Sequence, residues 1–400
     1  MSAAEPPQSA NSAPVGGSEA AKPRARADHA ADRVPVFAFV RDAELEQSLA
    51  AAALRVASRG QYVLGEEVAA FEREFADFCG TAQCIGVANG TDALEIALRA
   101  AGIDRGDRVA TVANAGYYTC AALAAIGAEP VFIDVDCTLT MSPSALHAAQ
   151  ADVKAVVVTH LYGRLAAIER ICAIAATRRM IVIEDCAQAH GASRNGKRAG
   201  SFGVAGCFSF YPTKNLGALG DAGAIVTSNP EFAARATALR QYGWNAKYDV
   251  EQAGGRNSRL DELQAAFLRV KLPRLASMNA ARIAVARRYC EGLRDTDLVL
   301  PQWNGDEYVA HLFVVRTGDR DALRARLNDE RIDTAIHYPI PDHRQRVRAS
   351  CRSCDLPTTE AACDQVLTLP CYPGLSAESV DRVVDVVRRH DVAKRALHAR

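Results

Sequence analysis

Short runs of apolar residues recur along the chain between about residue 44 and residue 230, and segments with helical periodicity separate them. Seven of the runs have the length of buried strands, at residues 85–87, 109–112, 130–135, 155–159, 181–183, 207–210 and 224–226. Helical patterns between them include residues 92–101, 166–176 and 232–242. This alternation predicts an α/β fold in which a mostly parallel seven-stranded sheet lies between layers of helices.

The pattern changes after residue 254. A long helical pattern covers residues 260–293, with a break or kink near Pro273. Strand-like segments at 309–315 and 333–337, a helix at 323–328 and a final helix from Ala377 predict a smaller α+β domain. We therefore expect a large domain over residues 34–290 and a small C-terminal domain over residues 291–400. Residues 1–33 are rich in Ala, Pro, Ser and Gly, which predicts a disordered tail.

Composition and charge narrow the class of protein. Lys+Arg and Asp+Glu both count 47, so no net field attracts the chain to nucleic acid or to an anionic membrane. No apolar stretch is long enough to span a bilayer, and the N-terminus lacks the apolar segment of a signal peptide. The 12 cysteines of such a chain are typical of reduced thiols. The sequence predicts a cytoplasmic enzyme with neither nucleic acid nor membrane as its partner.

Two predicted strands are followed by residues suited to pyridoxal phosphate chemistry. Asp185 follows strand 181–183, and Lys214 follows strand 207–210. Because parallel strands of an α/β sheet end at a common edge, we expect both side chains to face one cavity. A lysine amine can form a Schiff base with the cofactor aldehyde, and a carboxylate at the pyridine nitrogen keeps the ring able to accept electrons.

The cofactor phosphate requires hydroxyl or backbone N–H donors, and a helix N-terminus suits it best. Asn89, Gly90 and Thr91 lie between strand 85–87 and the predicted helix at 92–101, where the glycine lets the backbone approach closely and the turn caps the helix. Ser209 is a second candidate. Alone, residues 89–92 are equally typical of an ordinary turn, so this assignment depends on Lys214 and Asp185.

Together these segments resemble the DegT/DnrJ/EryC1/StrS family of sugar aminotransferases, which are fold-type I pyridoxal-phosphate enzymes. The resemblance covers about residues 35–392. Its motifs are residues 60–65, 89–92, 184–188, 209–214 and 257–264, with the late segments 337–339 and 369–374.

The resemblance implies a role for each matching residue. Lys214 would carry the cofactor, pyridoxal 5'-phosphate, as a Schiff base, and Asp185 would pair with the pyridinium nitrogen. Gln188 would lie near the ring hydroxyl. Gly90, Thr91 and Ser209 would hold the phosphate, and Asn257 would reach it from the partner subunit of a homodimer with shared active sites. The expected reaction transfers nitrogen from glutamate to a nucleotide-linked keto-deoxysugar.

One segment departs from the family pattern. Two positions after Asn114, common family members place an aromatic residue that stacks on the cofactor ring, whereas this chain has Gly116. Tyr117 could take that role, and residues 116–119 resemble enzymes that aminate deoxysugars at C3. This favours a dTDP-3-keto-6-deoxyhexose as the acceptor, with a 4-keto sugar or a cyclitol as alternatives.

Other residues and functions remain open at this stage. For the substrate's nucleotide diphosphate, the candidates are Lys247, Arg256, Arg259 and His337. A pyridoxamine-dependent sugar dehydratase is the second hypothesis, but such enzymes replace the lysine that this chain retains. A non-catalytic regulator is the third, and no DNA-binding module supports it. The spacing of Cys351 and Cys354 from the later cysteines does not suit a zinc site, so we expect no metal.

Overall fold

A computed structural model of the protein describes residues 33–39, 42–149, 152–302, 305–347 and 354–398. The chain after Arg33 forms one compact unit, Val34–Arg400. Apart from Arg33, the predicted disordered tail of residues 1–33 lies outside the described residues.

A seven-stranded sheet forms the centre of this unit, in the strand order β1-β9-β8-β5-β4-β2-β3. Its strands are β1 (Gln83–Val87), β2 (Arg108–Thr111), β3 (Glu129–Phe132), β4 (Ala155–Thr159), β5 (Ile181–Asp185), β8 (Ala205–Ser209) and β9 (Gly223–Thr227). Strand β9 runs antiparallel to both of its neighbours, and all other neighbours in the sheet are parallel. The seven predicted strands and the mostly parallel sheet are confirmed.

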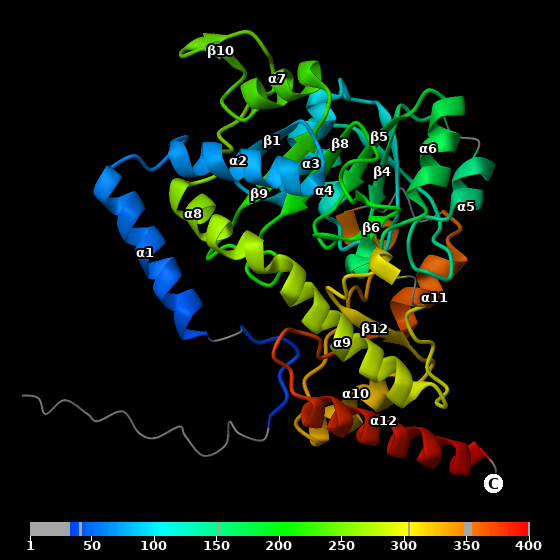
Figure 1. The fold of residues 1–400 in the computed structure, drawn as a ribbon. Coiled ribbons are helices and arrows are strands. Elements are labelled where there is room, and N and C mark those ends of the chain that lie inside the picture. The colour runs from blue at the N-terminus through cyan, green and yellow to red at the C-terminus, as the bar shows by residue number, and fades with distance from the viewer. Residues whose placement is uncertain (1–32, 40–41, 150–151, 303–304, 348–353, 399–400) are drawn as a thin grey trace, which may run out of the picture. The chain divides into compact units, whose positions relative to one another are not determined.

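Side chains on alternate positions of each strand enter different cores, because successive residues of a strand point to opposite faces. In β4, Val156 and Val158 join one core, and Ala155 and Val157 join the other. Helices α2 (Glu66–Cys79), α5 (Pro143–Ala148) and α6 (Ile168–Thr177) cover the first face. Helices α3 (Gly90–Ala100), α4 (Tyr118–Ile126) and α7 (Pro230–Leu239) cover the second (Figure 1).

A long, interrupted helical segment leads from the sheet to the C-terminal part of the chain (Figure 1). It consists of α8 (Glu262–Lys271), a 3-10 turn (Leu272–Arg274) and α9 (Leu275–Leu293), so the predicted break at Pro273 is confirmed. Helix α1 (Ala43–Arg59) packs against α8 through a small apolar cluster formed by Ala52, Val56, Ala266 and Phe267.

The C-terminal part builds a core of its own. Strands β12 (Phe313–Arg316) and β13 (Val366–Leu369) pair antiparallel, and helices α10 (Arg320–Asp329), α11 (Pro357–Gln365) and α12 (Ala377–His398) accompany them. Side chains of α9 also enter this core, among them Val285, Tyr289 and Leu293. The start of α9 packs in the core of the sheet through Leu275, and the rest of α9 packs in the C-terminal core. The predicted domain boundary near residue 290 stays a prediction.

The predicted helix at 323–328 and the predicted final helix from Ala377 are confirmed. The two predicted strands, at 309–315 and 333–337, need correction. The first is β12 and begins only at Phe313. The prediction of a strand at 333–337 was wrong. There, the Asp333 amide donates to the Val34 carbonyl, and the Ala335 amide donates to the Thr368 carbonyl. Because the two amides bond to different segments, residues 333–337 form isolated bridges and no continuous strand.

Two short hairpins complete the unit: β6 (Ser193–Arg194) with β7 (Lys197–Arg198), and β10 (Trp244–Ala246) with β11 (Asp249–Val250). Among the described helices, none has both the length and the apolar character that crossing a membrane requires. The cytoplasmic location expected from the sequence stays a prediction.

Candidate active site

A cavity of about 610 Å³ opens beside the carboxyl ends of β4, β5 and β8. Residues of three parts of the chain line it. The sheet and its helices contribute Asn89, Gly90, Thr91, Thr159, Asp185, Gln188, Ser209 and Lys214. The C-terminal part contributes His311, Leu312, Ala335, His337, Tyr338, Leu369 and Cys371, and the N-terminal segment contributes Val36 and Phe37. Asp185 and Lys214 thus share one cavity, as the sequence predicts.

Asp185 is the last residue of β5 and is only 5 % exposed. One carboxylate oxygen accepts a bond from the Ala187 amide at 3.1 Å, and the other accepts one from the Thr159 hydroxyl at 3.3 Å. Burial raises the pKa of Asp185, while the Ala187 amide and the charge of Lys214 act in the opposite direction. A cationic group in the cavity would therefore keep this carboxylate ionised.

Lys214 follows β8, and its side chain retains partial exposure toward the cavity. Within the described part of the chain, its amine makes no hydrogen bond or ion pair. Burial lowers the pKa of Lys214 to about 8, and the charge of Asp185 opposes that shift. Its neutral fraction near pH 7 is therefore far larger than that of an exposed lysine, and the neutral amine is a nucleophile and a proton acceptor.

The N-terminus of α3 forms one end of the cavity. The Asn89 side chain caps the helix by accepting a bond from the Asp92 amide at 2.8 Å. Ser209, the last residue of β8, approaches Gly90 closely, since a Cβ on Gly90 would lie 2.6 Å from the Ser209 Cβ. Gly90, Thr91 and Ser209 therefore meet at a helix N-terminus, which favours an anionic group.

Gln188 is fixed by two hydrogen bonds. Its carbonyl oxygen accepts a bond from the Tyr162 amide at 2.7 Å, and its amide nitrogen donates to the Tyr338 hydroxyl at 3.2 Å. The cavity therefore combines a nucleophilic amine, a buried carboxylate, a fixed amide and an anion site. These are the groups that bind an aldehyde, a pyridine nitrogen, a ring hydroxyl and a phosphate, so the residues fit pyridoxal phosphate.

The structure does not bring Tyr117 to the cavity. Its side chain packs beside Ala113, Cys120 and Phe132 in a separate apolar cluster. Tyr118, for which the sequence left ring stacking and a place in the core equally open, lines the cavity instead and is 50 % exposed. Tyr118 is the first residue of α4, and Tyr117, which precedes it, has a left-handed backbone with a φ of +72°.

Tyr338 explains the unusual Gly116. The Tyr338 ring is oriented edge-on to the Tyr118 ring, with centroids 6.2 Å apart and an interplanar angle of 76°. A Cβ on Gly116 would lie 2.9 Å from the Tyr338 ring, and the φ of Gly116 is +83°. Tyr338 thus occupies the space that a side chain at position 116 would need. This contact joins segments more than 200 residues apart, so no local pattern signals it.

A buried aspartate holds these segments together. The carboxylate of Asp342 accepts a bond from the Tyr117 amide at 2.9 Å and another from the Cys120 thiol at 3.4 Å. Its own amide donates to the Ala113 carbonyl at 2.7 Å. Asp342 is 1 % exposed. It therefore ties the 337–343 segment to the start of α4, where Tyr118 lies.

Of the four candidates for nucleotide binding, only His337 lines the cavity. Its Nδ1 is 2.8 Å from the Thr368 hydroxyl, and burial, assisted by the charge of Lys214, lowers the pKa of His337 to about 4. It is therefore neutral near pH 7.

The other candidates lie away from the cavity of their own chain. Arg256 forms ion pairs with Asp92, at 3.2 Å, and with Glu95 on α3. Lys247 lies on the β10–β11 hairpin above the Tyr248 ring. Arg259 and Asn257 do not line the cavity, and Asn257 is exposed.

A possible metal-binding group, His160, Glu184 and Cys186, lies buried behind β5. His160 Nε2 is 2.9 Å from a Glu184 oxygen, and its Nδ1 accepts a bond from the Ala166 amide. Glu184 also accepts bonds from the amides of Gly200, Phe202 and Gly203. Because His160 and Glu184 already bond to protein donors, these two residues hold the adjacent loops in place. Cys351, part of the dismissed zinc motif, lies outside the described residues.

The chain is similar to known aminotransferases over most of its length. The model of the DegT/DnrJ/EryC1/StrS aminotransferase family matches residues 43–388. A dTDP-3-amino-3,4,6-trideoxy-alpha-D-glucose transaminase of Micromonospora megalomicea is 42% identical over 364 residues, covering 88% of this chain and 97% of the relative. A dTDP-3-amino-3,6-dideoxy-alpha-D-galactopyranose transaminase of Aneurinibacillus thermoaerophilus is 44% identical over 339 residues, covering 84% and 93%.

A solved structure shows the same fold. The crystal structure of S. venezuelae DesV in complex with a ketimine intermediate superposes with a TM-score of 0.85 at 40% identity. The superposition covers 90% of this chain and 98% of DesV. The predicted fold class is thereby confirmed.

Proposed function

Since the chain belongs to the DegT/DnrJ/EryC1/StrS aminotransferase family, we propose that it aminates a nucleotide-linked keto-deoxysugar, with L-glutamate as the donor and pyridoxal 5'-phosphate as the cofactor. The acceptor proposed is a dTDP-3-keto-6-deoxyhexose, because two relatives above 40% identity are named for products aminated at C3. The observation that carries the proposal is the Lys214 amine, which shares its cavity with Asp185 and the N-terminus of α3.

Each protein group has a defined task in this reaction. When bound, the cofactor supplies an aldehyde that captures amines and a ring that accepts electrons. Lys214 would hold it through its side-chain amine. The Lys214 amine would accept the proton from the donor's α-carbon, and its lowered pKa makes the neutral form available. With the sugar as substrate, Lys214 moves a proton in the opposite direction at the carbon that receives nitrogen.

Asp185 would hold the proton on the pyridine nitrogen, while Thr159 and the Ala187 amide keep the carboxylate oriented. Gln188 would contact the ring hydroxyl, and Gly90, Thr91 and Ser209 would bind the phosphate. For the aromatic wall beside the ring we propose Tyr118 in place of Tyr117, since the Tyr118 ring lines the cavity.

The proposal includes a homodimer whose two subunits complete each active site. Asn257, Lys247 and Arg259 do not line the cavity of their own chain, and such residues can serve the partner's cavity. An apolar surface near the start of α8 supports an interface there. It consists of Tyr62, Val63 and Leu263, which are 58 %, 39 % and 38 % exposed.

Absorbance spectroscopy tests the proposal. Protein incubated with pyridoxal phosphate should show the visible band of a lysine-bound cofactor, and Lys214→Ala should abolish both the band and transamination. Lys271→Ala is the matched control, because Lys271 is a half-buried lysine outside the cavity that donates to the Gly217 carbonyl at 2.7 Å. Retention of band and activity in Lys214→Ala would refute the proposal.

The acceptor is tested separately. The pyridoxamine form of the enzyme is mixed with dTDP- and UDP-linked 3-keto and 4-keto sugars, and loss of its absorbance is followed. Reaction with the dTDP-linked 3-keto-6-deoxyhexose is expected to be fastest. Preference for a 4-keto sugar would contradict the proposed position of amination and leave the reaction type unchanged.

A further inference from the structure

His311 lines the catalytic cavity together with Lys214, and the proposed transamination gives it no task. Its side chain is 6 % exposed. Arg282 donates to the His311 carbonyl at 3.3 Å. On the other side, the His311 amide lies so close to the loop after β4 that a Cβ on Gly163 would approach its nitrogen to 2.8 Å. The backbone at His311 is therefore held from two sides.

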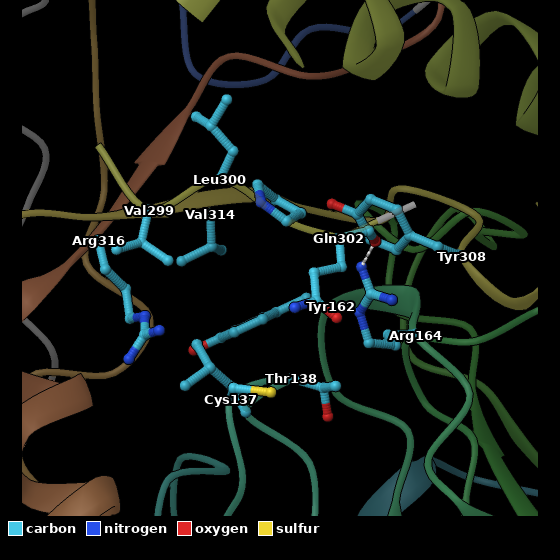
Figure 2. Close-up of a pocket in the computed structure, with 12 residues that line it drawn as sticks. Cys137, Thr138, Tyr162, Arg164, Val299, Leu300, Gln302, Tyr308, Val314 and Arg316 are labelled. Atoms are coloured by element: carbon cyan, nitrogen blue, oxygen red, sulfur yellow. Dashed lines mark hydrogen bonds between the residues drawn. The ribbon is translucent and has the colours of Figure 1, made fainter. Parts of the chain in front are cut away.

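The segment that carries this histidine, residues 308–312, packs against the loop after β4. The Val309 amide donates to the Gly163 carbonyl at 2.9 Å. Figure 2 shows the neighbouring contact, in which the Arg164 guanidinium lies over the Tyr308 ring with 4.8 Å from its central carbon to the ring centroid. The segment is thus a fixed part of the cavity wall.

A buried chain of hydrogen bonds determines which nitrogen of the His311 ring carries the proton. It ends on the backbone carbonyls of His190 and Val309, which can only accept. The Asn279 side-chain nitrogen donates to the His190 carbonyl at 2.8 Å, so the Asn279 oxygen is left for Asn215. The Asn215 side-chain nitrogen donates to that oxygen at 2.8 Å and to the Val309 carbonyl at 3.1 Å. Asn215 therefore presents its oxygen to His311 Nδ1, at 2.9 Å, and Nδ1 must be the donor.

The ring of His311 is neutral, so its Nε2 carries no proton. Burial lowers the pKa of His311 well below its usual range, and the charges of Lys214 and Arg282 act in the same direction. The other titratable groups around it, His190 and His337, are also neutral near pH 7, because burial lowers their pKa values to about 3 and about 4. Nε2 forms no hydrogen bond with any described residue, and it is not sealed within the protein. An open hydrogen-bond acceptor therefore faces the cavity.

The Lys214 amine is the matching donor. It lines the same cavity and has no bonded partner among the described residues. An ammonium group can only donate, so a buried one needs an acceptor. Both oxygens of Asp185 already accept bonds, from the Ala187 amide and the Thr159 hydroxyl.

We propose that His311 Nε2 accepts a hydrogen bond from the Lys214 amine and so orients it for proton transfer. The inference rests on the proposed function, in which Lys214 accepts the proton of the donor's α-carbon. Because His311 acts through Lys214, it is a positioning residue. His337 lines the same cavity, but its Nδ1 meets the Thr368 hydroxyl, which can donate or accept and so fixes no tautomer.

Two substitutions separate the open Nε2 from the bond to Asn215. His311→Asn keeps a donor near the position of Nδ1 and removes Nε2. His311→Gln keeps an acceptor near the position of Nε2 and removes the donor. Asp185, the charged group that acts on Lys214, is unchanged in both variants. A purely structural role of His311 would make the Gln variant the worse of the two, and the proposed role makes it the better.

Acetylation of Lys214 in the cofactor-free protein gives the first readout. Its rate with acetic anhydride is followed against pH by peptide mass spectrometry, since only the neutral amine reacts. The wild-type midpoint is expected near 8. Loss of one hydrogen bond to a charged group disfavours the ammonium form, so His311→Asn should lower the midpoint by about one pH unit. His311→Gln should stay near the wild type.

Turnover of the cofactor-loaded enzyme gives the second readout. His311→Asn should lower kcat about tenfold and leave the KM of the sugar acceptor nearly unchanged, and His311→Gln should recover part of the loss. His147→Asn is the control, because His147 is an exposed histidine on α5 outside the cavity, and it should behave as the wild type does.

The outcomes distinguish this inference from the proposed function. A wild-type midpoint in His311→Asn, or a larger effect of His311→Gln than of His311→Asn on midpoint and kcat, would overturn the role of Nε2. The acetylation profile requires no cofactor, so it reports on His311 and Lys214 independently of transamination. A wild-type protein that forms no lysine-bound cofactor would instead refute the proposed function, and with it the task given to His311.

Discussion

At the residue scale, the chemistry depends on how burial sets the charge of Lys214. The amine lies beside Asp185, whose charge would raise the pKa of Lys214, yet burial prevails and lowers it from 10.5 to about 8. Desolvation disfavours the charged form of a lysine. The neutral amine is therefore available at a pH where an exposed lysine is almost fully protonated.

This predicts the pH dependence of cofactor capture. Only the neutral amine attacks the aldehyde, so the rate at which cofactor-free protein binds pyridoxal phosphate should rise with pH through a midpoint near 8 and then level off. Asp185→Asn removes the opposing charge and should move the midpoint to lower pH. Stopped-flow absorbance gives both curves. A midpoint near 10 for the wild type would show that burial does not control this amine.

Gly116 is constrained in a different way, because its lack of a side chain leaves the space that the Tyr338 ring occupies. Gly116→Ala should place a methyl group against Tyr338 and force a left-handed backbone on alanine. Gly106→Ala is the matched control, since Gly106 has a φ of +82° and nothing within 4 Å of an added Cβ. Both variants should lose about 1 kcal/mol to the backbone.

The two glycine variants should differ in one respect. Gly116→Ala should lose a further ~1 to 3 kcal/mol, the usual cost of overpacking, and should slow turnover because Tyr338 lines the cavity. Urea unfolding measures the first effect and steady-state kinetics the second. Equal stability and equal turnover of the two variants would mean that the Tyr338 ring can move away from the added methyl group without loss of free energy.

At the element scale, several helices begin on carboxylates from distant parts of the chain. The N-cap positions of α2 and α4 provide no side-chain bond. Glu262 instead accepts bonds from the amides of Gly65, Glu67 and Val68 at the start of α2. Asp342 serves α4, and Asp134 accepts bonds from the Thr358 and Thr359 amides at the start of α11. These contacts connect helices to the segments they pack against.

Such remote caps explain which parts of the fold the sequence predicts well. The helices at 92–101 and 232–242 have local caps, Asn89 and Asn229, next to the residues they serve. The strands are runs of apolar residues because both faces of the sheet are covered. For α4, by contrast, the cap comes from Asp342, more than 200 residues later, and its first residues have no local start signal. Because the sequence does not show where α4 starts, it could not indicate that Tyr118, and not Tyr117, would line the cavity.

The same distinction holds within the site. Lys214, Asp185, Gly90 and Ser209 could be predicted together because the ends of parallel strands share one edge of the sheet. Tyr118 and Tyr338 could not, because their position depends on a contact between two loops that only the folded chain brings together.

Removing the remote cap of α4 gives an element-scale prediction. Asp342→Ala should destabilise the protein by about 1 to 3 kcal/mol, since two buried donors lose their acceptor. Amide exchange at the start of α4 should accelerate, and turnover should fall because Tyr118 loses its support. Asp134→Ala is the control, which should cost similar stability at α11 and leave exchange at Tyr117 unchanged. Unaltered exchange in Asp342→Ala would contradict the role assigned to Asp342.

At the scale of the whole molecule, the cavity joins distant parts of the chain. Val36 and Phe37 precede the sheet, Lys214 and Asp185 lie at its edge, and His337 belongs to the C-terminal part. The proposed dimer extends this to two chains, since each site would take Lys214 from one subunit and Asn257 from the other.

Mixing two inactive variants tests that arrangement. Lys214→Ala removes the amine, and Asn257→Asp places a negative charge where the partner's cofactor phosphate is proposed to bind, so each homodimer should be inactive or nearly so. In a mixed dimer, one site would combine the intact Lys214 of one subunit with the intact Asn257 of the other. Random reassociation of a two-fold dimer makes half of the dimers mixed, so about a quarter of all sites should recover.

The control mixes Lys214→Ala with Asp185→Asn. Both residues line the cavity of the same subunit, so every site in the mixed dimer keeps one defect and no activity should return. Activity is measured after subunits have been dissociated and reassociated together, with each variant treated alone for reference. Recovery in the first mixture and none in the second is the result that shared sites require. If neither mixture recovers although mixed dimers form, Asn257 does not serve the partner's site.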